Sequence, residues 1–385
     1  MKQLIRVFSL AIALAMIFAF TASAEASSPI YSYDDLFTSR DLRQTADLSG
    51  AVTYTVSDGQ DIRVTEAGVY VLTGSAADVT VYVEADKKDK VQLVLDGLSV
   101  TNSSFPVIYV KTADKVFVTV SGDSALAVTG TFVSDGDTNT DAVIFSKCDL
   151  VLNGTAALTI TSTNNGIAGK DDLKITGGTY TITADSKAIE ANDSICIADG
   201  ALNLTAGTDG LHAENSSDDS LGYVYIAGGS LTIAAGDDAI HATSVMQIDG
   251  GVLSIQAAEG IEASYIQING GTLNIQSWDD GINAASKSGA YRATVEINGG
   301  DVTVSMSAGD TDGIDSNGDI IVNGGTVSVT GSSTFDYDGS AQYNGGTLLV
   351  NGQQVSSIPN QMMGGGMGMM NNGGFSSWGN GGRGW

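Results

Sequence analysis

Residues 228–242 read GGSLTIAAGDDAIHA, and the phrase returns as GGVLSIQAAEGIEA at 250–263 and as GGTLNIQSWDDGINA at 270–284. Each copy has two glycines, a short alternating apolar run, an acidic turn and a closing Ile-x-Ala. The glycine doublets begin at Gly177, Gly228, Gly250, Gly270, Gly299, Gly324 and Gly345, with Asp199-Gly200 as a degenerate copy. The steps along this series are 22, 29, 22, 20, 29, 25 and 21 residues. Such a period is typical of a solenoid in which each repeat forms one coil and insertions loop out from one edge.

Side-chain directions within the repeat predict an all-β fold. Leu231 and Ile233 lie two positions apart in a strand, so they share the inward face. After the acidic turn, Ile240 points inward and His241 points outward. The sequence therefore predicts a parallel β-helix of about 22 residues per coil, and the preference of parallel crossovers predicts a right-handed one. A propeller would need repeats of roughly 40 residues.

The start of the chain has the pattern of a secretory signal peptide. Lys2 and Arg6 precede a short apolar stretch at 10–20, and Ala-Ser-Ala at 22–24 is a typical cleavage signal. We therefore predict a signal peptide over 1–24 and a secreted or cell-surface protein without membrane insertion. An uncleaved membrane anchor is the alternative.

The remaining chain divides into three segments. Residues 25–51 are polar and predict a linker or an N-terminal cap, and 52–351 carry the strand signals of the β-helix domain. Residues 352–385 are rich in Gly, Met and Asn and predict a disordered tail. Cys148 and Cys196 are expected to lie two coils apart and to remain independent thiols.

The charge balance limits the partners of this protein. Lys and Arg total 17 against 44 Asp and Glu, which gives a formal net charge of -27. Nucleic acids and anionic membranes require basic patches, so neither is an expected partner. Divalent cations and neutral polymers are compatible with such a surface. We expect a monomer.

Stacked coils turn one repeat position into a column of side chains. The position after the inward Ile or Leu gives the outer column, Glu190, His212, His241, Glu262, Asn283 and Asp315. The position three residues earlier gives the turn column, Lys187, Asp209, Asp238, Glu259, Asp280 and Asp312, beside which lie Asp237 and Asp279.

Adjacent carboxylates at about 4.8 Å repel one another by roughly 1 kcal/mol in water and about 4 kcal/mol near a protein surface. A cation between the columns would relieve this repulsion, and hard oxygen ligands from several turns suit Ca²⁺ better than Zn²⁺. The predicted calcium ligands are Asp209, Asp237, Asp238, Glu259, Glu262, Asp279, Asp280, Asp312 and Asp315. The alternative is a solvated acidic edge that keeps the solenoid soluble.

Outward aromatic rings predict a carbohydrate-binding surface, because they stack on the apolar faces of sugars. Trp278 lies beside the acidic columns, whereas Tyr291 and Tyr223 lie in or next to the two long insertions. His212 and His241, outward in the outer column, complete the predicted carbohydrate-binding residues. An eliminating lyase would need a basic residue near its calcium, for which Lys187 is the best candidate. A salt bridge at the head of the column is the simpler role for Lys187.

Two stretches, IRVTEAGVYVLTG at 62–74 and LDGLSVTN at 95–102, followed by PVIYV at 106–110, resemble a family of bacterial carbohydrate-binding domains with a polysaccharide-lyase-like right-handed parallel β-helix. The resemblance covers roughly 62–351. It implies a secreted protein with bound calcium that adheres to plant cell-wall polysaccharides such as cellulose or pectic polymers. The scarcity of basic residues departs from what an efficient lyase needs. The expected function is that of a secreted calcium-binding protein that binds polysaccharide through the side of the β-helix; a calcium-dependent pectate-type lyase and a structural cell-surface adhesion protein are the alternatives.

Overall fold

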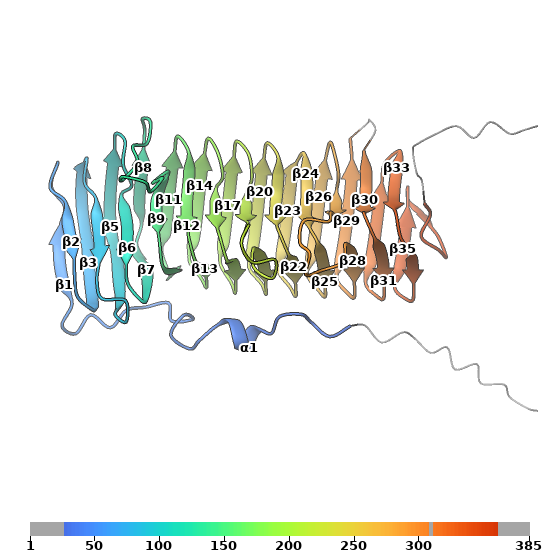
Figure 1. Ribbon diagram of the computed structural model, residues 1–385, viewed down its shortest axis with the longest axis horizontal. Helices are drawn as coiled ribbons and strands as arrows, with labels where there is room; N and C mark the ends of the chain where they lie inside the picture. Colours follow the sequence, from blue (N-terminus) through green and yellow to red (C-terminus); the bar gives the residue numbers. More distant parts are fainter. Residues whose placement is uncertain (1–26, 308–310, 361–385) are drawn as a thin grey trace, which may run out of the picture.

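The computed structural model describes residues 27–307 and 311–360, so the predicted signal peptide and residues 361–385 of the predicted tail lie outside it. The described chain forms one elongated all-β solenoid whose strands stack side by side along its length (Figure 1). Among these residues, no helix is long and apolar enough to cross a membrane.

Two sheets make up the wall of the solenoid. The larger has 24 strands: β1 (Val52–Thr55), β3 (Gly68–Ala77), β5 (Lys90–Asn102), β7 (Lys115–Gly122), β8 (Ser124–Val128), β10 (Asp149–Gly154), β11 (Ala157–Ser162), β13 (Asp172–Ile175), β14 (Thr179–Ala184), β16 (Ser194–Ile197), β17 (Ala201–Ala206), β19 (Tyr223–Ile226), β20 (Ser230–Ala235), β22 (Val245–Ile248), β23 (Val252–Ala257), β25 (Tyr265–Ile268), β26 (Thr272–Ser277), β28 (Thr294–Ile297), β29 (Asp301–Met306), β31 (Asp319–Val322), β32 (Thr326–Thr330), β34 (Ala341–Tyr343), β35 (Thr347–Val350) and β36 (Gln353–Gln354).

The smaller sheet has 12 strands: β2 (Ile62–Val64), β4 (Val81–Glu84), β6 (Ile108–Thr112), β9 (Ala142–Ser146), β12 (Asn165–Gly169), β15 (Ile189–Ala191), β18 (Leu211–Ala213), β21 (Asp238–Ala242), β24 (Glu259–Ala263), β27 (Ile282–Ala284), β30 (Asp312–Ser316) and β33 (Ser333–Tyr337). A repeat contributes two strands to the larger sheet and one to the smaller, as β22, β23 and β24 do. Neighbouring coils pair in parallel in both sheets. The one antiparallel pair between named strands, β35–β36, lies at the C-terminal end of the described chain and extends the larger sheet past the predicted domain boundary at residue 351.

The core is a stack of identical repeat positions, as predicted. Leu231 pairs with Leu253, Leu253 with Leu273, and Leu273 with Val302. All four side chains are buried. The all-β, parallel β-helix-like fold is therefore confirmed, while the handedness of the coil stays a prediction.

The glycine doublets make the turns between the two strands of the larger sheet. Gly251 has a φ of 95°, a left-handed conformation that favours glycine. A Cβ atom there would lie 3.0 Å from the carbonyl oxygen of Gly229 in the preceding coil. The doublet thus provides both the turn conformation and the room for coils to stack closely.

Residues 27–48, here called the N-terminal strap, run along one long side of the solenoid and include the short helix α1 (Tyr33–Leu36) (Figure 1). Ser27 Oγ donates to Glu296 at 2.6 Å, and Gln247 bonds both backbone groups of Tyr31. Farther along, Lys174 donates to the Leu36 carbonyl at 2.6 Å. The strap is thus neither a free linker nor an end cap, the two alternatives expected for residues 25–51.

Candidate functional site

The outer face of the 12-stranded sheet carries the predicted outer column. Strand register places His212 beside His241, His241 beside Glu262, and Glu262 beside Asn283. The column extends to Glu190 at one end and to Asp315 at the other. The repeat period therefore predicted the neighbours correctly, because parallel pairing converts sequence phase directly into position.

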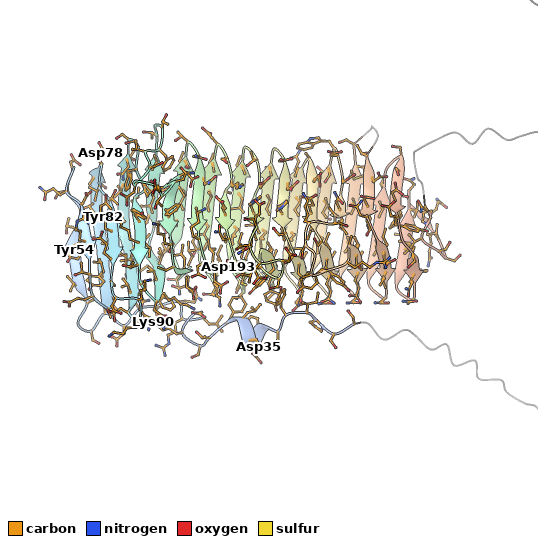
Figure 2. All side chains as sticks on the ribbon, viewed as in Figure 1. Asp35, Tyr54, Asp78, Tyr82, Lys90 and Asp193 are labelled. Carbon is orange, nitrogen blue, oxygen red and sulfur yellow. The ribbon has the colours of Figure 1, made fainter. Side chains whose placement is uncertain are left out.

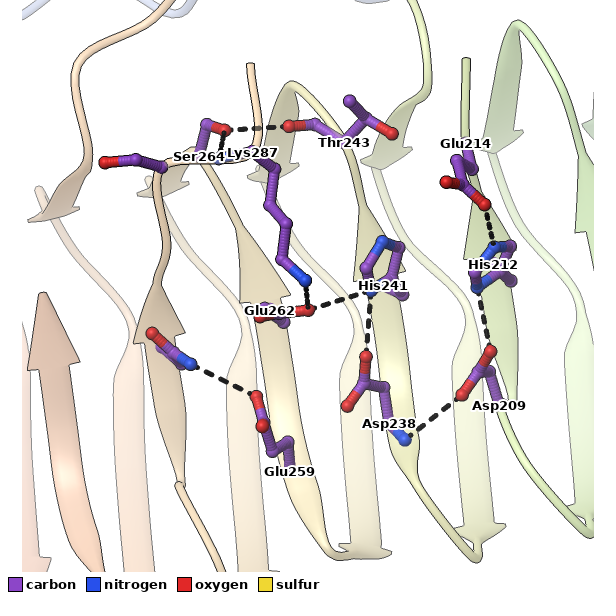
Figure 3. Close-up of polar contacts among 12 residues, drawn as sticks. Asp209, His212, Glu214, Asp238, His241, Thr243, Glu259, Glu262, Ser264 and Lys287 are labelled. Carbon is purple, nitrogen blue, oxygen red and sulfur yellow. Dashed lines mark hydrogen bonds and ion pairs between the residues drawn. The ribbon is translucent and has the colours of Figure 1, made fainter. Parts of the chain in front are cut away.

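In one half of this face, here called the histidine half, the rings of His212 and His241 lie against carboxylates. His212 Nδ1 lies 2.8 Å from Asp209 Oδ2, and its Nε2 lies 3.2 Å from Glu214 Oε2. His241 Nδ1 lies 2.8 Å from Asp238 and 2.9 Å from Glu262 (Figure 3). The two imidazoles stack with ring centroids 4.6 Å apart.

Charge partners shift the titration of these groups. Burial lowers the pKa of His241, but its bonds to Asp238 and Glu262 outweigh burial and raise that pKa to about 9. His241 is therefore a cation at neutral pH. Lys287 supplies a second cation, 2.9 Å from Glu262 (Figure 3). Although burial opposes the shift, the partners hold the pKa of Glu262 below its ordinary value.

The other half of the face, here called the acidic half, carries Glu259, Asp280, Asn283 and Asp315 and differs from the histidine half in its ion pairs. Burial and neighbouring carboxylates raise the pKa of Glu259 to about 7, that of Asp280 to about 6 and that of Asp315 to about 7. Within residues 27–307 and 311–360, none of these three forms an ion pair with a basic side chain. Asn283 Oδ1 is also buried without a hydrogen-bond partner there. These oxygens could ligate a hard cation.

Asp238, His241 and Glu262 are the one group of three in the described chain whose potential metal-ligating atoms all lie within 4.8 Å of one another. Because His241 is protonated at neutral pH, it occupies the place of a cation between the two carboxylates. The other predicted calcium ligands differ in exposure: Asp237 and Asp279 are exposed in the turns, whereas Asp209 is buried.

A polar cavity of about 270 Å³ opens beside the histidine half. Its lining residues come from two neighbouring coils and from the insertion that follows β18: Glu190, Asn192, Glu214, Asn215, Ser216 and Ser217. The second insertion reaches the first, because Ser288 Oγ donates to the Asp219 carbonyl. The two insertions therefore form a wall beside the columns, and its hydroxyl, amide and carboxylate groups could bind sugar hydroxyls.

The predicted aromatic residues separate into two groups. Trp278 is 46% exposed at the turn that leads into the turn column, as its repeat position predicts. Tyr223 instead stacks on Tyr31 of the strap, with ring centroids 4.2 Å apart. The ring centroid of Tyr291 lies 6.4 Å from that of Tyr265, whose hydroxyl donates a hydrogen bond to Glu296. The structure thus brings Trp278, but neither tyrosine, to the acidic columns.

His212 and His241, also predicted to contact carbohydrate, are only 8% and 9% exposed. Both nitrogens of His212 and Nδ1 of His241 already face carboxylates, and the rings are buried, so these side chains offer little surface to a sugar. Lys187 is paired with Glu190 at 3.8 Å, the simpler of its two predicted roles. Lys287 was not predicted as part of the site, because it lies in an insertion, where the repeat does not indicate which way a side chain points.

The chain is similar to a family of proteins, to one curated relative and to one solved structure. Residues 58–310 and 258–354 match the model of the family described as carbohydrate-binding domain-containing protein. A carbohydrate-binding domain-containing protein of Acetivibrio thermocellus is 33% identical over 130 residues, 32% of this chain and 46% of that relative. The chain therefore matches less than half the length of this relative.

A solved structure, the polysaccharide lyase-like protein from C. thermocellum in a gadolinium derivative, is 30% identical and superposes with a TM-score of 0.52. The match covers 58% of this chain and 96% of that one. It supports the parallel β-helix-like architecture, and the family match spans the whole stack of coils that carries the two columns. On this basis, the chain belongs to the carbohydrate-binding domain-containing protein family.

Proposed function

We propose that this protein is a secreted, calcium-dependent polysaccharide-binding protein whose binding surface is the outer face of the 12-stranded sheet. The observation that carries the proposal is the acidic half, where Glu259, Asp280 and Asp315 are half-buried with no basic partner among the described residues. This environment raises the pKa of each carboxyl. Trp278 lies next to this half, with 46% of its surface exposed. An exposed ring beside grouped oxygen ligands suits a sugar that stacks while its hydroxyls are held by polar groups.

The proposed calcium ligands are Glu259, Asp280 and Asp315, with Asn283 Oδ1 as a neutral oxygen. Because the oxygens of these three carboxylates do not all lie within 4.8 Å of one another, their side chains would have to move toward a bound ion. Their donor chemistry fits, since Ca²⁺ takes carboxylate and amide oxygens at flexible geometry. Bound calcium would supply positive charge between the columns and a coordination position for a sugar hydroxyl or carboxylate. Asp209, Asp238 and Glu262, also predicted as ligands, instead face His212, His241 and Lys287, respectively.

Cellulose and pectic polymers are the proposed ligands, by the resemblance to plant-polysaccharide binders. Binding is favoured over cleavage, because Lys187 and Lys287, the nearest basic residues on this face, both form ion pairs with glutamates. A base engaged in an ion pair is poorly suited to proton abstraction.

The test is retention of purified protein on insoluble cellulose and on immobilised polygalacturonate, with calcium and with a chelator. Retention that falls with chelator on polygalacturonate, without unsaturated products absorbing in solution, supports the proposal. Equal failure to bind both polymers in calcium would leave the structural adhesion alternative. Accumulation of unsaturated products would instead support the lyase.

A further inference from the structure

A second cavity, of about 350 Å³, lies in the N-terminal half of the solenoid, in the coils that precede Glu190 of the outer column. It is built by the end of β6 and by the turns that follow β4, β6, β9 and β12, so four successive coils contribute to it. Lys90, which begins β5 and pairs with Asp114 of the cavity, is labelled at the lower left of the solenoid in Figure 2. The cavity is lined by Lys87, Lys111, Thr112, Ala113, Asp114, Lys147, Cys148 and Asp171.

Basic residues are concentrated here against the charge of the whole chain. The protein carries a net charge of -27, and residues 191–360 contain one lysine, Lys287, and one arginine, Arg292. Three lysines nevertheless line this single cavity: Lys87, Lys111 and Lys147. An anion approaching the molecule is repelled over most of the surface, so a basic cavity is where it can dock.

The lysines differ in whether other groups neutralise them. Lys111 is paired with Asp135 at 3.0 Å and with Glu84 at 3.6 Å. Lys147 donates to the Thr138 hydroxyl at 2.7 Å, and neither it nor Lys87 has a carboxylate within ion-pair distance in the described parts of the chain.

The carboxylates of the cavity are partly balanced. Asp114 is paired with Lys90, which lies in the same turn region. Burial, followed by nearby carboxylates, raises the pKa of Asp171 and so disfavours its charged form. The two lysines without carboxylate partners are therefore available to an external anion.

We propose that this cavity binds the carboxylate of an acidic sugar, with Lys87 and Lys147 as the cationic ligands and the Thr112 hydroxyl as a further polar group. Its volume suits a sugar unit, because small-molecule sites begin near roughly 300 Å³. The inference rests on the proposed polysaccharide binding and adds a calcium-independent site for uronate residues. Lysine acts here as a point charge that holds a carboxylate without a metal.

The test uses the whole protein and trigalacturonate, in the presence of a chelator that silences any calcium-dependent site. Isothermal titration is expected to detect binding that Lys147→Ala weakens by about tenfold, the loss of roughly one charge-assisted hydrogen bond. Lys147→Arg keeps the charge and is expected to retain most of the affinity. Lys88→Ala is the matched control, since Lys88 neighbours Lys87 but does not line the cavity.

Cys148 provides an independent readout, because it lines the cavity and is half-buried, whereas Cys196 is buried. Trigalacturonate is expected to slow modification of Cys148 by N-ethylmaleimide, and cellotriose is not. Equal slowing by inorganic phosphate would overturn the assignment to an acidic sugar. The assignment of a binding site to this cavity would be overturned if Lys88→Ala weakened trigalacturonate binding as much as Lys147→Ala does, or if trigalacturonate did not bind in chelator. Lys147→Ala is expected to leave cellulose retention and calcium-dependent polygalacturonate retention unchanged, so these measure the proposed function separately.

Discussion

Glu259→Gln gives the sharpest test of the proposed cation site. Burial, Asp238 and Glu262 raise the pKa of Glu259 from 4.5 to about 7. The folded protein therefore binds more protons than the unfolded chain between these values, so this group makes the free energy of unfolding fall as pH rises from about 4.5 to about 7. The difference between an ordinary pKa of 4.5 and a folded-state pKa of about 7 corresponds to roughly 3 kcal/mol, which partial solvent exposure reduces to about 1–2 kcal/mol.

Glutamine removes this charge and keeps an oxygen that can accept from Asn283 Nδ2, which lies 3.2 Å from the Glu259 carboxylate. In chelator, the Glu259→Gln protein is expected to be more stable than the parent by about 1–2 kcal/mol at pH 8 and equally stable at pH 4. Calcium is expected to stabilise the parent and to stabilise the variant less, because one ligand has lost its charge.

Urea unfolding at several pH values, with and without calcium, measures both effects. Asp237→Asn is the matched control, since it removes one negative charge from an exposed neighbouring position. The reasoning is refuted if Glu259→Gln is less stable than the parent at pH 8 in chelator. It is also refuted if calcium stabilises parent and variant equally.

Four further changes test other parts of the molecule. Because the pKa of His241 is about 9 in the folded protein, its stabilising charge is fully present below pH 6.5 and is lost as pH rises through 9. His241→Gln is expected to lower the free energy of unfolding by roughly 3 kcal/mol at pH 6 and by little at pH 10, measured by urea unfolding. Trp278→Ala is expected to reduce retention on cellulose by about threefold to tenfold in a depletion assay, and undiminished retention would place the sugar elsewhere. Gly251→Ala is expected to cost about 1–3 kcal/mol in thermal unfolding, because its φ is 95° and the preceding coil lies close. Phe37→Ala is expected to loosen the strap and to speed maleimide labelling of Cys196, which packs in the same apolar cluster; unchanged labelling would contradict that covering role.

The sequence predicted those features that follow from the repeat. His212, His241 and Glu262 stack as expected, because parallel pairing preserves their phase. The ion pair between Lys287 and Glu262 could not be predicted, since Lys287 lies in an insertion whose path depends on contacts with another insertion. The prediction that the His241 side chain points away from the core was also correct. Its burial could not be predicted, because it depends on side chains from neighbouring coils.

The strap was the largest feature outside the reach of the repeat pattern. Its residues show no period, and its position depends on partners more than 100 positions away, as in the bonds from Lys174 to Leu36 and from Gln247 to Tyr31. Tyr223 was consequently predicted as an exposed sugar platform, although its ring stacks on Tyr31. Local patterns report strand phase, whereas docking of an irregular segment depends on the finished surface.

The strap also changes how the solenoid is expected to come apart. In a simple stack, each coil touches only its neighbours, so the ends can fray one repeat at a time. Here a single segment bonds to Lys115 near one end, through Asp41, and to Glu296 many coils away, through Ser27. Opening any intermediate coil must disturb a segment that is shared by all of them. The strap is therefore expected to make unfolding more cooperative along the solenoid axis, because the coils that it contacts cannot unfold independently of one another.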